Sequence, residues 1–157
     1  MLTPTAETRW HAAQPFVVTG AVAIIAGGFI AAGVARRPLQ HLVWMSAYLV
    51  LVAGIAQIVF GAGQAWLPTR LAGTRWIAAE WGIFNLGNAG VITGTLMGSF
   101  PLVLVGTLLF AVGIALFLLG THAANRRGWL LGYRVLLGLI FLSSLVGLAL
   151  SVRARLG

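Results

Sequence analysis

Apolar residues fill five stretches of this chain, and polar or turn-forming residues separate them. The clearest signal is a run of 45 residues, from Trp81 to Asn125, that contains no Lys, Arg, Asp or Glu. As one straight helix this run would be about 68 Å long, whereas the hydrocarbon core of a bilayer is about 30 Å thick. We therefore expect the chain to fold back inside a membrane, with a turn near Ser99 to Pro101.

The five stretches predict an all-α bundle of five transmembrane helices. Each stretch is long enough to cross the hydrocarbon core, and a lipid-exposed backbone must be helical there to satisfy its hydrogen bonds. The connections are short, so consecutive helices should be antiparallel neighbours. The predicted helices cover residues 15–35, 42–66, 76–98, 101–121 and 130–152, within a single integral membrane domain over residues 1–157.

Local signals mark several of the predicted helix ends. Pro15 and Pro101 suit the first turn of a helix, where a missing N–H costs no hydrogen bond. Thr74 is expected to cap the third helix. An alternative with four spans also stays open, in which segment 76–98 is re-entrant and returns to the side from which it entered.

Composition narrows the class of protein. The chain is 60% hydrophobic and only 8% charged, against about 25% charged residues in a typical soluble domain. All ten basic residues are Arg, the only acids are Glu7 and Glu80, and the lack of Cys excludes disulfides and thiol chemistry. The arginines lie in small groups between apolar stretches. Membrane lipids, rather than nucleic acid, are therefore the expected partners.

The aromatic and basic residues also suggest how the chain sits in a membrane. With five spans, six arginines lie on the membrane side of the N-terminus and four on the other side, which places the N-terminus inside. The Arg36-Arg37 pair favours the opposite orientation. The use of Arg with much Ala and Gly is typical of a bacterial protein, which would lie in the inner membrane. The tryptophans that lie near segment ends, as an interfacial belt requires, are Trp10, Trp44, Trp66, Trp76, Trp81 and Trp129.

The third segment is the main candidate for function, because Glu80 is the only carboxylate inside an apolar stretch. At 100° per residue it shares a helix face with Phe84, Gly87 and Asn88, and that face should turn inward. Two interpretations remain open. In the first the amides serve only to bond to neighbouring helices, and in the second the stripe forms a ligand, proton or ion site. The residues of the proposed pathway are Glu80, Asn85 and Asn88, with Gln57 and Gln64 from the second segment.

Two further features belong to this segment. Gly90, Gly94 and Gly98 form a GxxxGxxxG pattern, which lets helix backbones approach closely. Arg70 and Arg75 precede the segment, and either could form a structural ion pair with Glu80 at the membrane interface.

Histidines offer a second kind of site. If all five segments span, His11, His122 and Glu80 share one membrane face, and two imidazoles with a carboxylate suit haem iron or a transition metal. If the third segment is re-entrant, His41 and His122 share a face instead. No HxxxH or HExxH spacing supports a metal site, so interfacial histidine without a ligand is the competing interpretation.

The stretch from Glu80 to Thr95, with its Asn-Leu-Gly-Asn core and the following Pro101, resembles a late helix in the catalytic subunits of haem–copper oxidases of the nitric-oxide-reductase type. The resemblance covers about 20 residues. The family has about twelve spans and a set of six histidines, which this chain lacks. The resemblance therefore implies a haem-associated relative or fragment, and it carries over no catalytic residue.

Three function classes follow from these observations. The first is a non-catalytic membrane protein, either an accessory subunit in a larger complex or a homo-oligomer with a small-molecule or ion pathway along the third helix. The second is a haem- or metal-binding membrane protein in electron transfer or gas sensing. The third is a lipid-modifying enzyme that uses Glu80 or a histidine as a base near the headgroups.

Overall fold

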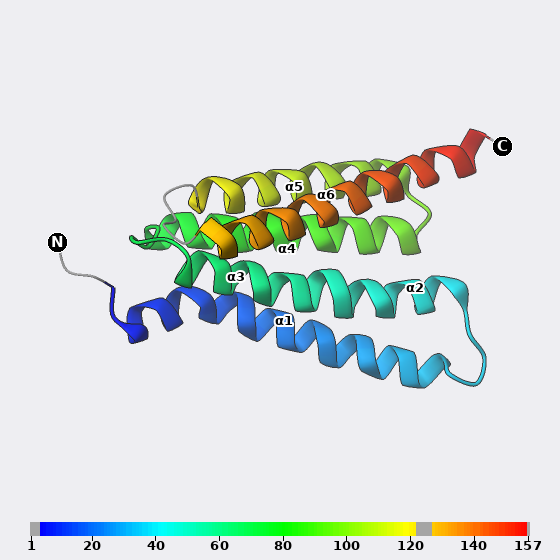
Figure 1. Ribbon diagram of the computed structural model, residues 1–157. Coiled ribbons are helices and arrows are strands. Elements are labelled where there is room, and N and C mark those ends of the chain that lie inside the picture. Colours follow the sequence, from blue (N-terminus) through cyan, green and yellow to red (C-terminus); the bar gives the residue numbers. More distant parts are fainter. Residues whose placement is uncertain (1–3, 122–126, 157) are drawn as a thin grey trace. The chain divides into compact units, whose positions relative to one another are not determined.

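The computed structural model describes residues 4–121 and 127–156, and every regular element in that part of the chain is a helix (Figure 1). The predicted all-α class is therefore confirmed. The chain divides into two compact units, Met1–Ala72 and Gly73–Gly157. In order, the helices are α1 (Ala6–Val34), α2 (Gln40–Tyr48), the π-helix η1 (Leu49–Ala56), α3 (Gln57–Trp66), α4 (Thr74–Leu96), α5 (Phe100–Gly120) and α6 (Arg127–Leu156).

Four helices are long and apolar enough to cross a membrane. They are Ala6–Val34, Gln40–Trp66, Phe100–Gly120 and Gly128–Ala149. The predicted third segment is also a single helix, α4, of 23 residues, but it carries Arg75, Glu80 and two asparagines and is less apolar than the others. The structure thus supports a membrane protein with four spans, one fewer than predicted, and a span by α4 stays a prediction.

Several helix ends differ from the sequence-based prediction. α1 begins at Ala6 because Thr5 caps it, with the Thr8 N–H donating to Thr5 Oγ1 at 3.3 Å. Pro15 consequently lies inside the helix, where we had expected it in the first turn. Thr74 is the first residue of α4, and its N-cap is Gly73, so the predicted cap was wrong. Pro101 does lie in the first turn of α5.

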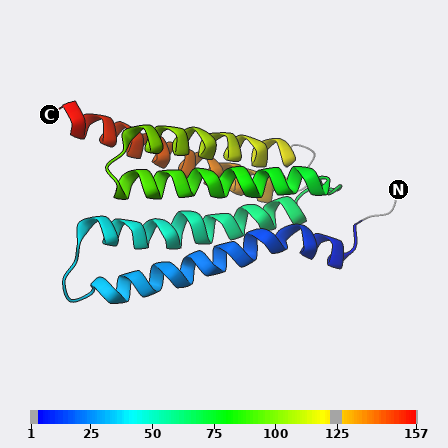
Figure 2. The same cartoon turned by 180° about the vertical axis from the view of Figure 1, so that it is seen from behind.

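The first unit is an antiparallel hairpin of α1 against the continuous helix formed by α2, η1 and α3 (Figures 1 and 2). Glycines bring the two backbones together. A Cβ on Gly20 would lie 2.9 Å from the carbonyl oxygen of Gly54, and a Cβ on Gly61 would lie 2.3 Å from Cβ of Phe16. Such distances leave no room for a methyl group. Close packing of small residues therefore holds the hairpin together.

The π-helical segment keeps one face of the second helix directed at α1. Gly27 faces Ser46 and Val50, and Gly20 faces Gly54 and Ile58, so the residues of the second helix that meet α1 recur every four positions. In an α-helix four residues turn about 400°, and a four-residue repeat drifts about 40° per step. The wider turn of η1, with its i→i+5 hydrogen bonds, offsets that drift.

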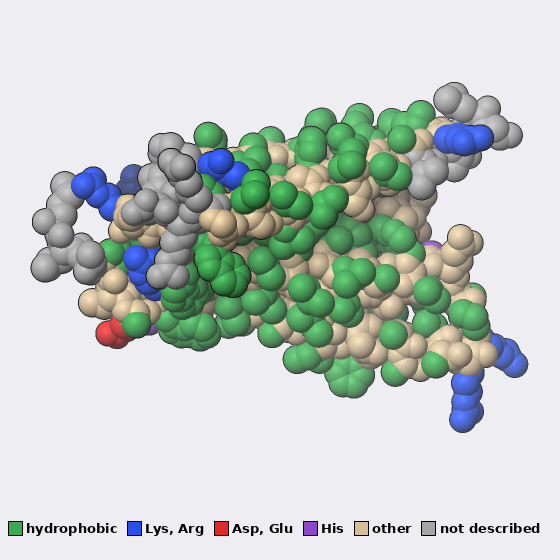
Figure 3. Space-filling model, viewed as in Figure 1, with side chains coloured by type: hydrophobic (Ala, Val, Ile, Leu, Met, Phe, Trp, Pro, Cys, Tyr) green, Lys and Arg blue, Asp and Glu red, His purple; other side chains and the backbone are tan. Residues whose placement is uncertain are grey.

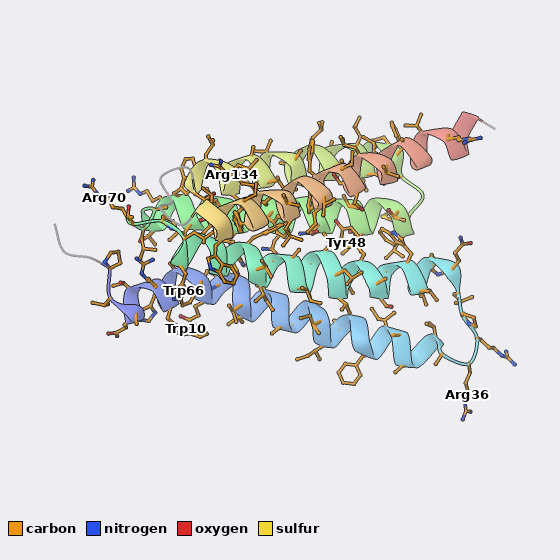
Figure 4. The ribbon with its side chains drawn as sticks, viewed as in Figure 1. Trp10, Arg36, Tyr48, Trp66, Arg70 and Arg134 are labelled. Carbon is orange, nitrogen blue, oxygen red and sulfur yellow. The ribbon has the colours of Figure 1, made fainter. Side chains whose placement is uncertain are left out.

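The two ends of the hairpin have different chemistry. Trp10 and Trp66 lie at one end and Arg36 at the other (Figure 4). The 26 residues from Trp10 to Arg36 correspond to about 39 Å of helix, which matches the thickness of a bilayer with its headgroup regions. In Figure 3 the arginine side chains gather at helix ends, whereas hydrophobic side chains cover the middle of the helices. This is the distribution that a membrane requires.

Arg9 closes the tryptophan end of the hairpin. Its Nη1 donates to the carbonyl oxygens of Ala65 at 2.5 Å and Pro68 at 3.3 Å. These carbonyls lie at and just beyond the last turn of α3, which has no intrahelical donors left for them. The Arg9 guanidinium, near the start of α1, thus donates hydrogen bonds to carbonyl groups at the end of α3.

In the second unit α4 and α5 run antiparallel, with their backbones in direct contact (Figure 2). A Cβ on Gly87 would lie 2.6 Å from the backbone nitrogen of Phe110, and one on Gly94 would lie 2.5 Å from that of Val103. A Cβ on Gly90 would lie 2.8 Å from Cα of Gly106. The predicted packing role of Gly90 and Gly94 is therefore consistent with the structure, and Gly87 and Gly106 take part as well.

Gly98, the third glycine of the predicted pattern, has another role. A Cβ there would meet nothing within 4 Å, so Gly98 does not pack against a helix. Its φ of 63° places it in the left-handed region that ends helices. The Ser99 N–H donates to the Gly94 carbonyl at 2.8 Å and the Gly98 N–H donates to that of Thr95 at 3.3 Å, which is a Schellman motif. Gly98 therefore starts the turn into α5.

Aromatic side chains pack at the end of this glycine contact that lies nearer to the start of α4. The ring of Phe84 on α4 lies 5.1 Å from that of Phe110 and 5.6 Å from that of Phe117, both on α5. α6 packs against α5, and its buried side chains include Tyr133 and Leu137. These helices position the one buried carboxylate of the described chain.

We predict opposite effects for two glycine-to-alanine changes in the second unit. Gly94→Ala should destabilise the protein by about 1–3 kcal/mol, because the new methyl overlaps the α5 backbone. Gly138→Ala on α6 is the control, since its Cβ meets nothing within 4 Å, and it should be neutral or stabilise by up to about 1 kcal/mol. Thermal unfolding in detergent, followed by tryptophan fluorescence, measures both. Equal midpoints for the two variants would contradict the packing described here.

Candidate functional site: a buried carboxylate on α4

The side chain of Glu80 is ionisable, and yet it is completely buried in the structure. It lies six residues after the first residue of α4, which places its Cα about 9 Å along the helix axis. An ionised carboxylate at such a position carries a desolvation cost, and it persists where polar groups around it offset that cost. The surroundings of Glu80 therefore decide what it can do.

The indole of Trp76 supplies one such group. Trp76 Nε1 donates a hydrogen bond to Glu80 Oε1. The two residues are four apart and so lie on the same face of α4, one turn from each other. The sequence contains this Trp-x-x-x-Glu spacing, but a bond between Trp76 and Glu80 had not been predicted from it. Trp76 as a whole is 38% exposed, whereas the carboxylate to which it bonds is buried.

Tyr133 brings a second aromatic ring to the site, from α6. Its side chain is buried and lies within electrostatic reach of the Glu80 carboxylate. No sequence pattern had indicated this residue, because the apolar pattern of α6 does not show which of its turns comes near Glu80. Arg75 and Arg134, which adjoin Trp76 and Tyr133 in the chain, are both exposed. The region thus combines one buried acid, an indole that bonds to it and a buried tyrosine, and each of these aromatic residues has an exposed arginine next to it in the chain.

The two asparagines of the predicted stripe bond to their own helix. Asn85 Nδ2 donates to the Trp81 carbonyl at 2.7 Å, and Asn88 Nδ2 donates to the Phe84 carbonyl at 2.9 Å. Asn88 is buried, as predicted for the face that carries Glu80, whereas Asn85 is half-buried. These two amide donors therefore reach back along α4. Bonds from the asparagines to neighbouring helices stay a prediction.

Gln57 and Gln64 are also buried, but they belong to α3 in the first unit. Gln57 Nε2 donates to Thr19 Oγ1 on α1, so this glutamine links the two helices of the hairpin. The predicted meeting of Gln57 and Gln64 with the polar stripe of α4 stays a prediction.

The histidines give no support to a metal centre within the described residues. His11 is exposed, with Nε2 at 3.9 Å from Glu7 Oε1 on its own helix, and His41 is exposed at the start of α2. These two lie at opposite ends of the hairpin, as the topology predicted. His122 lies outside the described residues. Among residues 4–121 and 127–156 no three His, Cys, Asp or Glu side chains gather, and the haem or metal interpretation stays a prediction.

Comparison with known proteins leaves the candidate site to be judged on its geometry alone. No protein-family model, no curated protein and no solved structure matches the chain. The resemblance of residues 80–101 to a helix of the haem–copper oxidases therefore also stays a prediction.

We predict that the Trp76–Glu80 hydrogen bond couples the two side chains energetically. Trp76→Phe keeps an aromatic ring but removes the N–H donor, so it should destabilise the protein by about 1.5–3 kcal/mol, the range for a hydrogen bond to a charged group. The same change in a Glu80→Gln background should cost less. Unfolding midpoints of the four proteins measure the coupling. Trp129→Phe, at a ring that is 75% exposed, is the control and should have little effect. Equal losses in both backgrounds would show that the bond contributes nothing.

Proposed function

We propose that this chain is a small integral membrane protein that conducts protons or a small solute, with Glu80 as the group that gains and loses a proton. The observation that carries the proposal is the burial of Glu80 on α4 with the Trp76 indole donating to its carboxylate. An ionisable side chain within membrane helices is costly, and such residues commonly line proton or ion pathways.

The position of Glu80 supports exchange with the membrane surface. The carboxylate lies less than two turns from the start of α4, where Arg75 is exposed. A proton that leaves Glu80 therefore has a short distance to travel to the headgroup region. The partly exposed Trp76 ring lies along that route, and a change in its rotamer would open or close it.

The glycine contacts support a fixed framework around this group. Gly87, Gly90 and Gly94 hold α4 against the backbone of α5, so the helix that carries Glu80 cannot shift without losing these contacts. A rigid scaffold with one movable aromatic ring suits a gated site. A monomer of this size has little interior volume, and we propose that a continuous pathway forms in a homo-oligomer.

We predict that Glu80→Gln abolishes proton movement. The purified full-length protein is placed in liposomes that contain a pH-sensitive dye, and a potassium gradient with valinomycin drives proton entry. The wild-type protein should acidify the liposomes well above the rate of protein-free vesicles, and Glu80→Gln should return that rate to background because an amide does not titrate.

Glu7→Gln is the matched control, since Glu7 is the other acid of the chain and is exposed in the first turn of α1. This variant should conduct as the wild type does. Infrared spectroscopy gives an independent measure: a protonated-carboxyl band that appears on acidification in wild type and Glu7→Gln, but not in Glu80→Gln, identifies the titrating group. Equal proton flux in wild type and Glu80→Gln would refute the proposed role of Glu80.

A further inference from the structure

We propose that two copies of this chain associate through α4, with the Asn85 side chains of both copies bonded to each other across a two-fold axis. This inference rests on the proposed function, because it names the surface that forms the homo-oligomer proposed there. It takes α4 as a membrane span, as the sequence predicts. The observation that carries it is the open part of the Asn85 amide.

The Asn85 amide is only partly satisfied by its own helix. Its Nδ2 donates to the Trp81 carbonyl at 2.7 Å, which uses one of the two amide hydrogens. Within residues 4–121 and 127–156 no group donates to its Oδ1. One acceptor and one donor therefore remain open, and part of the side chain lies at the surface, since Asn85 is half-buried.

Asn85 lies at the depth where an open amide is most costly. It is eleven residues from Thr74 and eleven from Leu96, the two ends of α4, and so about 17 Å from each. In a spanning helix this position is the bilayer midplane, which neither water nor headgroups reach. Lipid tails offer no hydrogen bonds, so a polar group of another helix is the partner that removes the cost.

A second copy of Asn85 is the partner that fits this amide. The open N–H carries a positive partial charge and the open oxygen a negative one, so the amide is complementary to a copy of itself. A two-fold axis along the membrane normal places each donor against the other chain's acceptor, and two equal hydrogen bonds form. Both copies then keep the same orientation in the membrane, and their α4 helices run parallel.

The residues around Asn85 leave room for a second helix. The Asn85 face of α4 has the alternating spacing of four and three residues that is typical of paired helices. Half of its members are alanine or glycine, and a Cβ on Gly82 would meet nothing within 4 Å. Small residues let two backbones come close enough for the short asparagine side chains to meet. The members, all exposed or half-buried, are Ala78, Gly82, Asn85, Ala89, Ile92 and Leu96.

The Asn85 face is separate from the contact with α5. Asn85 and Gly94 are nine residues apart, which at 100° per residue places them on opposite sides of α4. Gly94 meets α5, so α4 can keep that contact and pair with a second copy as well. The outward face of α5 differs from the Asn85 face, because it is formed by bulky aliphatic residues that suit lipid: Leu102, Val105, Leu108 and Val112.

Cysteine cross-linking tests which face the two copies share. The chain contains no cysteine, so a single introduced cysteine reports on one position without background. Oxidation of full-length Gly82→Cys in liposomes should give a disulfide-linked dimer. Leu108→Cys is the matched control, on the 57% exposed outward face of α5, and should stay monomeric. Equal cross-linking at the two positions would reflect random collision and would overturn the inference.

Energy transfer between donor- and acceptor-labelled copies, measured as the protein is diluted with lipid, tests the role of the amide. Asn85→Leu should weaken dimerisation roughly tenfold or more, because it removes both hydrogen bonds. Gly82→Leu should also weaken it, since the larger side chain keeps the helices apart, and this variant covers the case in which Asn85→Leu does not fold. Gly132→Leu on α6 is the control and should dimerise as the wild type does, because a Cβ there also meets nothing within 4 Å.

A wild type that is monomeric at every dilution, or dimers of unchanged strength in both Asn85→Leu and Gly82→Leu, would overturn the inference. If proton flux depends on Glu80 while the wild type is monomeric, proton conduction stands and the α4 interface falls. If the copies pair through α4 but wild type and Glu80→Gln pass protons equally, the interface stands and proton conduction falls.

Discussion

Lipid offers no hydrogen bonds to a polypeptide backbone, and this constraint shapes the rest of the structure. Every backbone group in the apolar stretches must find a partner inside its own helix, and the helices must then associate without a hydrophobic driving force between them. The chain meets the second requirement with glycine. In the second unit Gly90 and Gly106 put two backbones in contact, and in the first unit Gly20 and Gly54 do the same.

This close contact of backbones also explains why a polar site can exist on α4. The face that carries Glu80 also carries Gly87 and Gly94, which meet α5. Dispersion contacts along that seam stabilise the pair of helices and offset the cost of placing a carboxylate among them. Phe84 lies between Glu80 and Gly87 along α4, and its ring packs against those of Phe110 and Phe117 on α5.

The sequence predicted the helices well because hydrophobic segments and charge-free runs report directly on membrane insertion. It also predicted the burial of Glu80 and Asn88, since both follow from the face shared at 100° per residue. The details that the sequence did not predict depend on backbone conformation and on how helices pack against one another. The role of Gly98 rests on a positive φ, and the position of Tyr133 within electrostatic reach of Glu80 rests on how α6 packs in the second unit. The early start of α1 rests on a cap at Thr5, a polar residue that lies outside the apolar pattern of the helix.

The π-helical segment η1 has a consequence for sequence comparison. A π-helical turn holds an extra residue relative to an α-helical one, and removal of that residue restores an ordinary α-helix while the flanking turns keep their relative phase. A homologue that lacks one residue between Leu49 and Ala56 would therefore still present the counterparts of Ser46 and Ile58 to the neighbouring helix. An alignment gap inside this apolar stretch, which would ordinarily argue against common ancestry of two membrane helices, is the expected mark of relatedness here.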